Sequence, residues 1–304
     1  MNKLCSVFWD VDGTLADTEM EGHRVAFNAA FAEAELAWYW DQLLYAELLR
    51  IPGGRQRIET YAERLGEEFN EEFLAQLRRR KQHHYIERIR TGHVPWRPGV
   101  RRLLMELQLN GVEQWVVTTS GRDSVNALLE VSFPSGDSPF RGCITAEDVY
   151  LGKPHPEGYL HALCASGFKK NEVIVIEDSA AGLAAARAAN LPCLLTPSPW
   201  DQELKSQFHQ ANAVFDHLGD KGLPCKVLVG PPCLQGQVKL VMTKKGSDIS
   251  SWSDSTPRRS VELQSSVKSR REPCLIILRT RRVGVRMKGP WVWCCALQTK
   301  GSSF

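Results

Sequence analysis

The sequence predicts an α/β protein with a doubly wound parallel sheet and a separate group of helices inserted after its first strand. Short runs rich in Val and Ile, which are typical of buried parallel strands, alternate with helical patterns along residues 5–200. Residues 19–93 contain helical patterns and no strand pattern. We therefore expect an α/β core formed by residues 1–18 and 94–232, and an inserted helical domain formed by residues 19–93.

The predicted strands are short apolar segments, and helical patterns follow the second and third of them. An alanine-rich pattern over 179–191 predicts a helix that ends just before Pro192, since proline cannot continue a helix. In the inserted segment, amphipathic patterns predict helices at 23–36 and 71–89. The predicted strands lie at residues 6–10, 114–119, 173–178 and 192–197.

The charge of the chain is unevenly distributed. Its formal net charge is +3, but 14 of the 38 Lys and Arg and only 4 of the 35 Asp and Glu lie from Val238 onward. Residues 244–273 are rich in Ser, Arg and Lys and have neither a helix nor a strand period. We expect residues 238–304 to form a basic, disordered tail. A basic tail is one way to bind nucleic acid, but no recognition module accompanies it, so we expect no nucleic-acid partner.

The cysteines and the apolar runs indicate a cytoplasmic protein. The nine cysteines are odd in number and form no C-x-x-C pair, which favours reduced thiols over disulfides or a zinc site. No apolar run reaches the roughly 18 residues of a membrane helix. The chain begins almost at once with a predicted strand and shows no secretory signal pattern.

Polar side chains stand where three of the predicted strands end. In doubly wound sheets, ligands bind beyond the carboxyl ends of the strands, so polar groups at several such ends predict a site. The two acids of the first strand end are i and i+2 neighbours, which point the same way from an extended chain. The residues at the three ends are Asp10 and Asp12, Thr118 and Thr119, and Glu177 and Asp178.

The acidic strand ends predict a magnesium site. Two carboxylates aimed at one point repel each other unless a cation or a proton lies between them. With Asp178 added from another strand end, Asp10 and Asp12 offer three hard oxygen ligands, which suit Mg²⁺. We expect Glu177 to orient these ligands.

Magnesium beside carboxylates directs attention to phosphoryl transfer. Asp10 can act as the nucleophile and form an aspartyl-phosphate, while Asp12, carrying a proton, can protonate the leaving oxygen and later activate water. Thr118 can donate a hydrogen bond to a phosphate oxygen. Lys153, held between Gly152 and Pro154 on a stiff segment, can supply a fixed positive charge.

Four segments, FWDVDGTLADTE, VVTTS, GKPHP and VIVIEDSAAGLAAARAA, resemble in order and spacing the motifs of the haloacid dehalogenase superfamily. The resemblance implies a Rossmann-like doubly wound parallel sheet with an inserted small α-helical cap domain, and a Mg²⁺-dependent enzyme that works through an aspartyl-phosphate. The implied catalytic residues are Asp10, Asp12, Thr118 and Lys153, and the implied metal ligands are Asp10, Asp12 and Asp178.

A narrower resemblance covers residues 1–237. The segments ADTEMEGHRVAFNAAF, WYWD, YAELLRIPGGRQRI and HLGDKGLPCKVLVGPPC are similar to CbbY-type proteins. The resemblance implies a phosphatase for xylulose-1,5-bisphosphate, a misfire product that inhibits Rubisco. The substrate-binding residues that it implies are Glu19, His23, Gly53, Gly54, Arg55, Arg78, Lys81, Thr119 and Ser120.

Three other functions remain open at this point. A β-phosphoglucomutase-like isomerase uses the same core, cap and phosphorylated aspartate, and a phosphatase of the phosphoglycolate type differs only in its substrate. A binding protein that acts through the basic tail belongs to a different class. For the favoured function we expect a monomer whose partner is a small sugar phosphate.

Overall fold

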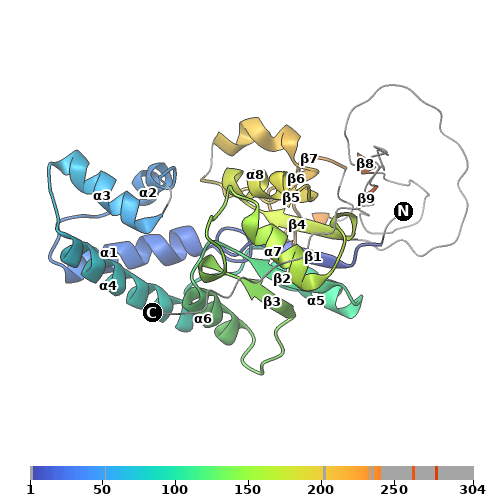
Figure 1. The fold of residues 1–304 in the computed structure, drawn as a ribbon, viewed down its shortest axis with the longest axis horizontal. Helices are drawn as coiled ribbons and strands as arrows, with labels where there is room; N and C mark the ends of the chain where they lie inside the picture. The colour runs from blue at the N-terminus through green and yellow to red at the C-terminus, as the bar shows by residue number, and fades with distance from the viewer. Residues whose placement is uncertain are drawn as a thin grey trace, which may run out of the picture.

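The computed structural model describes residues 3–51, 53–200, 203–231, 233, 236–240, 262–263 and 278–279. Within these ranges the core is a seven-stranded sheet in the order β3-β2-β1-β4-β5-β6-β7, in which all neighbours are parallel except β6 and β7 (Figure 1). The strands are β1 Ser6–Trp9, β2 Glu113–Val117, β3 Phe140–Ile144, β4 Val173–Glu177, β5 Cys193–Leu195, β6 Ala213–Phe215 and β7 Val227–Val229.

The first strand, β1, lies at the centre of the sheet. Its four residues are all buried, which explains the uninterrupted apolar character of this segment. In the register of the sheet, Ser6 lies opposite Glu113 of β2 on one side and Val173 of β4 on the other. The chain segments that follow β1, β2 and β4 therefore lie next to one another, beyond the carboxyl ends of these parallel strands.

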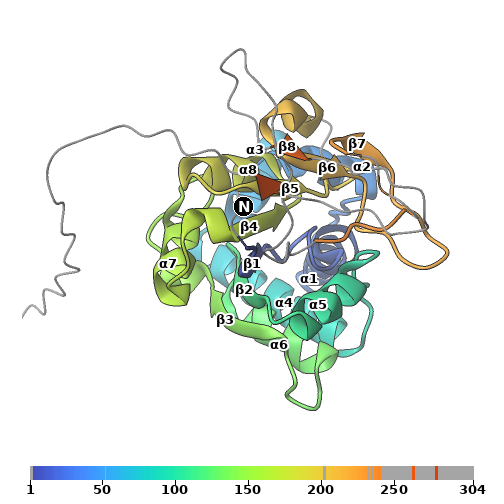
Figure 2. The same cartoon turned by 90° about the vertical axis from the view of Figure 1, so that its right-hand side faces the viewer.

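Helices cover both faces of the sheet, as Figure 2 shows. Alternate residues of β1 separate the two layers: Val7 and Trp9 belong to the apolar cluster with α5 and α6, and Phe8 belongs to the cluster with α7 and α8. The helices are α5 Val100–Leu109, α6 Arg122–Ser132, α7 Glu157–Ser166 and α8 Ala180–Ala188. Short 3₁₀ turns join the core elements: η2 Ala146–Asp148, η3 Lys170–Glu172 and η4 Glu203–Gln210.

The inserted helices form a second body to the side of the sheet (Figure 1). They have an aromatic core of their own, in which the rings of Phe31 and Trp40 lie edge to face with centroids 4.7 Å apart. The Asn70 side chain accepts a hydrogen bond from Phe73 N at 2.9 Å and so caps the longest helix. The elements are η1 Glu19–Arg24, α1 Val25–Glu33, α2 Gln42–Leu48, α3 Gly54–Leu65 and α4 Glu71–Arg90.

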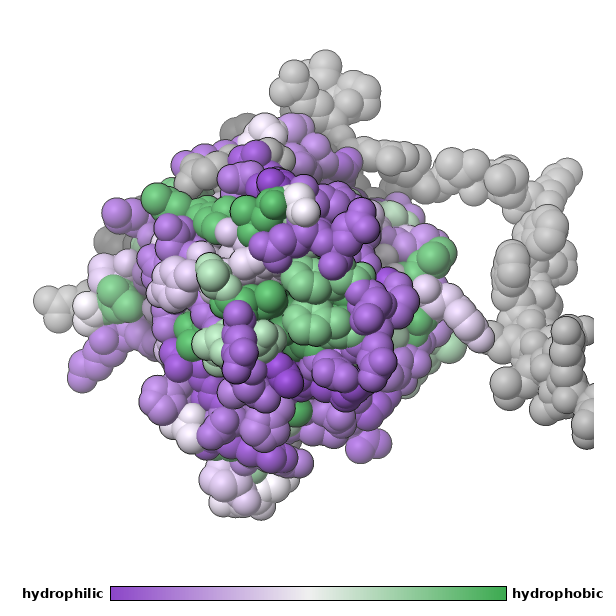
Figure 3. Space-filling model, turned by 90° about the vertical axis from the view of Figure 1, so that its left-hand side faces the viewer, coloured by the Kyte–Doolittle hydropathy of each residue, from purple (hydrophilic) through white to green (hydrophobic). Residues whose placement is uncertain are grey.

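The outer face of this helical body is mixed in polarity. Figure 3 shows apolar side chains gathered near the middle of the face and polar ones around them. In the helical body, Tyr39 and Leu43 are exposed apolar residues, with 68% and 78% of their surface accessible. Apolar atoms make up more than half of the surface of a typical folded protein, so we assign this face no function.

The two linkers between the helical body and the sheet lie side by side. Ala16 and Trp96 form an isolated antiparallel bridge, Asp17 N donates to Pro95 O at 2.9 Å, and Arg97 N donates to Leu15 O at 2.9 Å. The chain thus leaves and re-enters the sheet through one paired strip. We propose that this strip marks the expected limits of the cap at residues 19 and 93.

The predicted α/β fold with a parallel sheet is confirmed. Three strands of the seven-stranded sheet were not predicted, namely β3, β6 and β7. The sequence of β3, Phe140–Ile144, contains Arg141 and Gly142 and its residues are only partly buried at the sheet edge, so it lacks the apolar run of a central strand. None of the helices in the described ranges is both long and apolar enough to cross a membrane.

The basic tail expected at 238–304 lies for the most part outside the described residues. The described parts are residues 238–240 and two short strands, β8 Glu262–Leu263 and β9 Leu278–Arg279, which pair antiparallel with each other. Val238 N donates to Leu218 O at 2.9 Å, so the start of the segment is attached to the core. The expectation of disorder beyond it remains an expectation.

Gly99 follows the second linker, and a substitution there tests how closely this segment packs against residues 218–219. It has a φ of 84°, and a Cβ there would lie 2.5 Å from Gly219 O. We predict that Gly99→Ala lowers the free energy of unfolding by ~1–2 kcal/mol for the left-handed backbone, plus about 1–3 kcal/mol for the clash. Gly92→Ala is the matched control, because Gly92 has a φ of 73° and open space around it.

Urea unfolding of both variants checks this prediction. The Gly92→Ala variant should show only the backbone cost, so the two midpoints should differ. Equal midpoints would mean that the 218–219 segment moves away from the new Cβ without lowering the free energy of unfolding.

Candidate active site

Asp10 lies at the carboxyl end of the central strand, directly beside Lys153. Its backbone N–H donates to Ile176 O at 3.1 Å, which extends the pairing of β1 with β4 by one residue. Lys153 Nζ lies 2.5 Å from Asp10 Oδ1 and also donates to Val117 O at 2.9 Å. Both side chains are about one-tenth exposed, so this is a nearly buried ion pair. From the sequence we expect Lys153 to supply a fixed cation for the phosphoryl group; the structure places it beside Asp10, and its role stays a prediction.

Glu177, at the end of β4, is the second partner of Lys153. Its Oε1 lies 2.7 Å from Lys153 Nζ and accepts a hydrogen bond from the Tyr159 hydroxyl. Its Oε2 accepts from Ser179 Oγ at 3.3 Å. A Cβ at Gly182 would overlap the Glu177 carboxyl group at 1.9 Å, so only glycine fits the first turn of α8 there. Glu177 is therefore held from four sides.

Asp178 lies next to the turn that follows β1. A Cβ at Gly13 would lie 2.1 Å from Asp178 Oδ2, so the carboxylate packs against the bare backbone of that glycine. Burial raises the pKa of Asp178 well above its ordinary value, and the nearby Asp10 and Glu177 carboxylates raise it further.

The carboxylates of Asp10, Glu177 and Asp178 form one cluster, in which one oxygen atom of each lies within 4.8 Å of the other two. Burial raises the pKa of Asp10 to about 7, although Lys153 opposes this. For Lys153, burial alone would lower the pKa, but Asp10 and Glu177 outweigh it and raise the pKa above the ordinary value. Lys153 is one positive charge among three buried acids, so the cluster lacks positive charge. Mg²⁺ prefers hard oxygen ligands such as these carboxylates and would supply that charge.

Asp12 points to a different set of partners. Its Oδ2 accepts a hydrogen bond from Ser120 Oγ, and its Oδ1 lies 3.4 Å from His23 Nε2. Burial would raise the pKa of Asp12, but His23 and Ser120 outweigh burial and hold the pKa well below its usual range. The arrangement favours an ionised Asp12, whereas the sequence interpretation placed a proton on it.

The threonines after β2 differ from each other. Thr118 is buried, and its Oγ1 accepts a hydrogen bond from Ser120 N at 3.1 Å, which shapes the turn toward Asp12. Thr119 is exposed, and its side chain packs near Gly152, since a Cβ there would lie 3.1 Å from Thr119 Cγ2. Thr118 and Thr119 directly precede Ser120, and Thr119 lies beside Gly152, the residue before Lys153.

A line of side chains connects the cap to Asp12. His23 in η1 stacks on the Tyr85 ring with centroids 4.0 Å apart, and its Nδ1 lies 2.8 Å from Lys81 Nζ of α4. The ammonium group of Lys81 also lies 5.1 Å from the centre of the Phe27 ring. Because ammonium can only donate, His23 Nδ1 is the acceptor, and Nε2 is then free to donate toward Asp12.

Glu19 is the centre of a second cap cluster. Its Oε2 accepts a hydrogen bond from the Tyr45 hydroxyl at 2.8 Å and lies 3.8 Å from Arg57 Nη1. Arg57 also donates from Nε to Ile51 O at 2.9 Å, and its side chain is only 11% exposed. Arg57 is thus a nearly buried cation directed inward from the first turn of α3.

Other predicted cap residues lie farther from these contacts. Arg55 is 42% exposed and pairs with Glu59 at 2.8 Å and with Glu71. Arg78 is exposed, and its charge helps to lower the pKa of Lys81. Gly53 has a φ of 83° as the residue before α3, which by itself explains a glycine, and a Cβ at Gly54 would lie 3.1 Å from the Phe27 ring.

Glu177 and Arg57 belong to these clusters but are not among the predicted catalytic, metal or substrate-binding residues. Glu177, which we expect to orient the ligands, lies in the carboxylate cluster itself, and its orienting role stays a prediction. Arg57 was not considered, although the helical period contains the signal: α3 begins at Gly54, and the buried Ile58 follows Arg57 on the inner face. Arg55 and Glu59, an i,i+4 pair, lie on the outer face.

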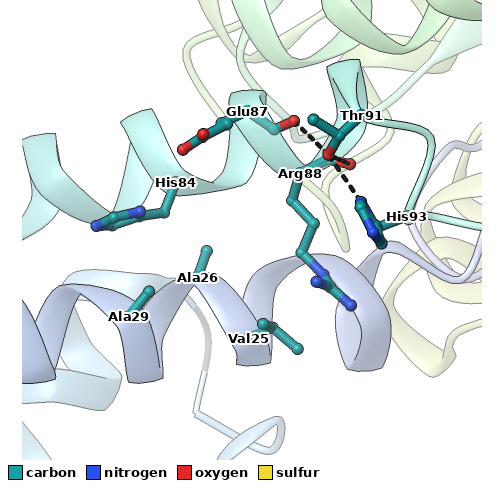
Figure 4. Close-up of a pocket in the computed structure, with 8 residues that line it drawn as sticks. All are labelled: Val25, Ala26, Ala29, His84, Glu87, Arg88, Thr91 and His93. Carbon is teal, nitrogen blue, oxygen red and sulfur yellow. Dashed lines mark hydrogen bonds between the residues drawn. The ribbon is translucent and has the colours of Figure 1, made fainter.

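A separate cavity of about 290 Å³ lies between α1 and α4 (Figure 4). Its polar wall comes from α4 and the following turn, where His93 Nδ1 lies 2.8 Å from Thr91 Oγ1. None of its lining residues is one of the predicted site residues. They are Val25, Ala26, Ala29, His84, Glu87, Arg88, Thr91 and His93.

Comparisons with known proteins identify the family of the chain. The sequence model of the haloacid dehalogenase-like hydrolase family matches residues 6–190. Protein CbbY of Rhodobacter capsulatus is 40% identical over 200 residues, which cover 65% of this chain and 87% of that protein. A CBBY-like protein of Arabidopsis thaliana is 35% identical over 223 residues, which cover 71% of this chain and 69% of that protein.

A solved structure is similar over the same region. The crystal structure of CbbY from Rhodobacter sphaeroides in complex with xylulose-(1,5)bisphosphate superposes with a TM-score of 0.64 and 30% sequence identity. The match covers 72% of this chain and 99% of that chain. The chain belongs to the haloacid dehalogenase-like hydrolase family, among its CbbY-type members, and is a phosphatase of the phosphoric monoester hydrolase class.

Proposed function

We propose that this phosphatase removes one phosphate from a sugar bisphosphate, with xylulose-1,5-bisphosphate as its substrate and Mg²⁺ as its cofactor. The observation that carries the proposal is the presence of two cationic centres. Lys153 lies against Asp10 at the strand ends, and Lys81 and Arg57 face inward from the cap. The CbbY structure with xylulose-(1,5)bisphosphate supports the choice of this substrate.

Asp10 and Asp178 are the residues that we propose for the metal, together with Glu177, which shares their cluster. The raised pKa values of Asp10 and Asp178 support this assignment, since buried acids that repel one another gain most from a bound cation. Bound Mg²⁺ would neutralise charge on the transferring phosphoryl group. The assignment of Asp12 as a ligand through its side chain has less support, because that side chain pairs with Ser120 and His23.

The nucleophile in this proposal is the Asp10 carboxylate. One of its oxygens attacks phosphorus, the bond from phosphorus to the sugar oxygen breaks, and an aspartyl-phosphate forms. Lys153 holds the carboxylate in place and offsets negative charge during this step. Thr118, at the neighbouring strand end, is the proposed donor to a phosphate oxygen.

Asp12 is the proposed acid and base. In the first step it must carry a proton for the leaving oxygen, and in the second it takes a proton from the attacking water. Its low pKa depends on His23, which belongs to the cap element η1. Movement of the cap that withdraws His23 would raise the pKa of Asp12 and allow it to be protonated.

The substrate preference can be measured directly as phosphate release with Mg²⁺. We expect strong release from xylulose-1,5-bisphosphate and little from β-glucose-1-phosphate, because a monophosphate cannot engage both cationic centres. We also expect little release from ribulose-1,5-bisphosphate, which carries the same two phosphates and therefore tests whether the site also distinguishes the sugar. If the protein instead converted glucose-1-phosphate to glucose-6-phosphate without phosphate release, it would be a mutase. Preferred release from phosphoglycolate would exclude the bisphosphate specificity.

The two arginines of α3 give a matched pair of variants. Arg57→Ala should raise KM for the bisphosphate at least tenfold, because it removes a nearly buried cation that can bind phosphate. Arg55→Ala should change KM less than twofold, because Arg55 is exposed and already paired with Glu59 and Glu71. Steady-state kinetics on both variants checks this, and the reverse order would return the role to Arg55.

Lys81 predicts a pH dependence of binding. Burial lowers the pKa of Lys81 to about 8, with Glu19 and Asp12 opposing and Arg57 and Arg78 adding to the shift. The ammonium form, which can bind phosphate, is therefore present below pH 8 and lost above it. We predict that kcat/KM for the bisphosphate falls above about pH 8, by up to tenfold per pH unit.

The control for this prediction is Lys81→Gln, which has no titrating amine. Its kcat/KM should be low at every pH and should lack the fall above pH 8. If both proteins showed the same alkaline limb, another group would be responsible and Lys81 would have no role in binding.

A further inference from the structure

Arg97, on the second linker, donates hydrogen bonds to the backbone of three separate loops. Its guanidinium group donates to Gly13 O, to Thr196 O and, at 2.8 Å, to Asp216 O. These carbonyls follow β1, β5 and β6, so one side chain joins three strand ends. It donates also to Pro197 O at 3.2 Å.

The contact with Gly13 connects Arg97 to the carboxylate cluster. The Gly13 backbone is the surface against which the Asp178 carboxylate packs, with no room for a Cβ between them. Any shift of the Gly13 peptide would therefore move the neighbour that positions Asp178. Arg97 fixes this peptide through its carbonyl oxygen, and the opposite side of the same turn is closed by the bond from Gly13 N to Ala16 O at 2.9 Å.

Arg97 also acts through its charge. Burial lowers its pKa, while Asp178, Asp17 and Asp216 favour its charged form. Arginine remains charged in proteins, and its hydrogen-bond partners here are neutral carbonyl oxygens. Its positive charge therefore lies at the Gly13 turn, against which the Asp178 carboxylate packs.

We propose that Arg97 is a positioning residue for the metal site: it holds the Gly13 peptide and the Asp178 carboxylate in the arrangement that binds Mg²⁺. Through its backbone bond to Leu15 O, the same residue attaches the paired linkers of the cap to this arrangement. The inference rests on the proposed function in one respect, namely that Asp178 is a metal ligand. It extends that function to a residue outside the strand-end cluster.

Arg102 is a natural control, because it makes the same kind of contacts elsewhere. It donates to Gly219 O at 3.0 Å, to Leu218 O at 2.8 Å and to Val238 O at 3.0 Å. These carbonyls belong to the segments around residues 218–219 and 238, away from the Gly13 turn. A general loss of backbone support should therefore appear in Arg102→Lys as well as in Arg97→Lys.

The test is Mg²⁺ binding to the full chain without substrate, measured by calorimetry and by the rise of Tm with MgCl₂. Arg97→Lys should weaken Mg²⁺ binding by about 10–100-fold, as expected for loss of a residue that orients a metal ligand. Arg102→Lys should bind Mg²⁺ as the wild type does. At saturating Mg²⁺, KM of Arg97→Lys for the bisphosphate should stay within twofold of the wild-type value.

The proposal is overturned if folded Arg97→Lys binds Mg²⁺ with wild-type affinity, or if Arg102→Lys loses as much affinity. Should Arg97→Lys not fold, Arg97→Gln is titrated in the same way, and failure of both to fold would make Arg97 a structural residue only. If the wild type itself bound no Mg²⁺, the proposed metal dependence would fail first, which is a distinct result.

Discussion

The main constraint on the site is that its buried carboxyl groups outnumber the positive charges that contact them. One oxygen atom each of Asp10, Glu177 and Asp178 lies within 4.8 Å of the other two, and Lys153 is the cation that contacts two of these residues. Burying a charge is costly unless the group has an ion-pair or hydrogen-bond partner. The stability of the cluster therefore depends on the groups that pair with its carboxylates. The parallel order of β1 and β4 brings the acids together, and Tyr159, Ser179 and the Gly182 backbone complete the surroundings of Glu177.

The cap supplies what the sheet lacks. The sheet edge carries the acids and one lysine, whereas the inward face of the cap carries Lys81 and Arg57. Asp12 lies between the two bodies, with Ser120 from the sheet on one oxygen and His23 from the cap on the other. Substrate recognition by the cap and the protonation state of Asp12 are therefore linked through the same helices, which explains how closure could time the chemistry.

The sheet and its site could be predicted from sequence because strand ends are marked by abrupt changes from apolar to acidic residues. Asp10 and Asp178 follow from this rule and Lys153 from the stiff segment before Pro154, and the structure brings the three together. The partners of Asp12 could not be predicted, since Ser120 and His23 reach it from 108 and 11 residues away. Arg55 came from the resemblance of its segment to CbbY-type proteins, and Arg57 was not considered, because the start of α3, and hence the inward face of the helix, was not known. The edge strand β3 was missed for want of an apolar run.

The most direct test of the account is to look for phosphate on Asp10. The wild type and Asp10→Asn are mixed with xylulose-1,5-bisphosphate and Mg²⁺, quenched rapidly in acid, and digested for mass spectrometry. The account predicts the mass of one phosphoryl group on the peptide that contains Asp10 in the wild type, and neither the label nor turnover in Asp10→Asn, because an amide is a poor nucleophile. Substantial turnover by Asp10→Asn, or a label on another residue, would contradict it.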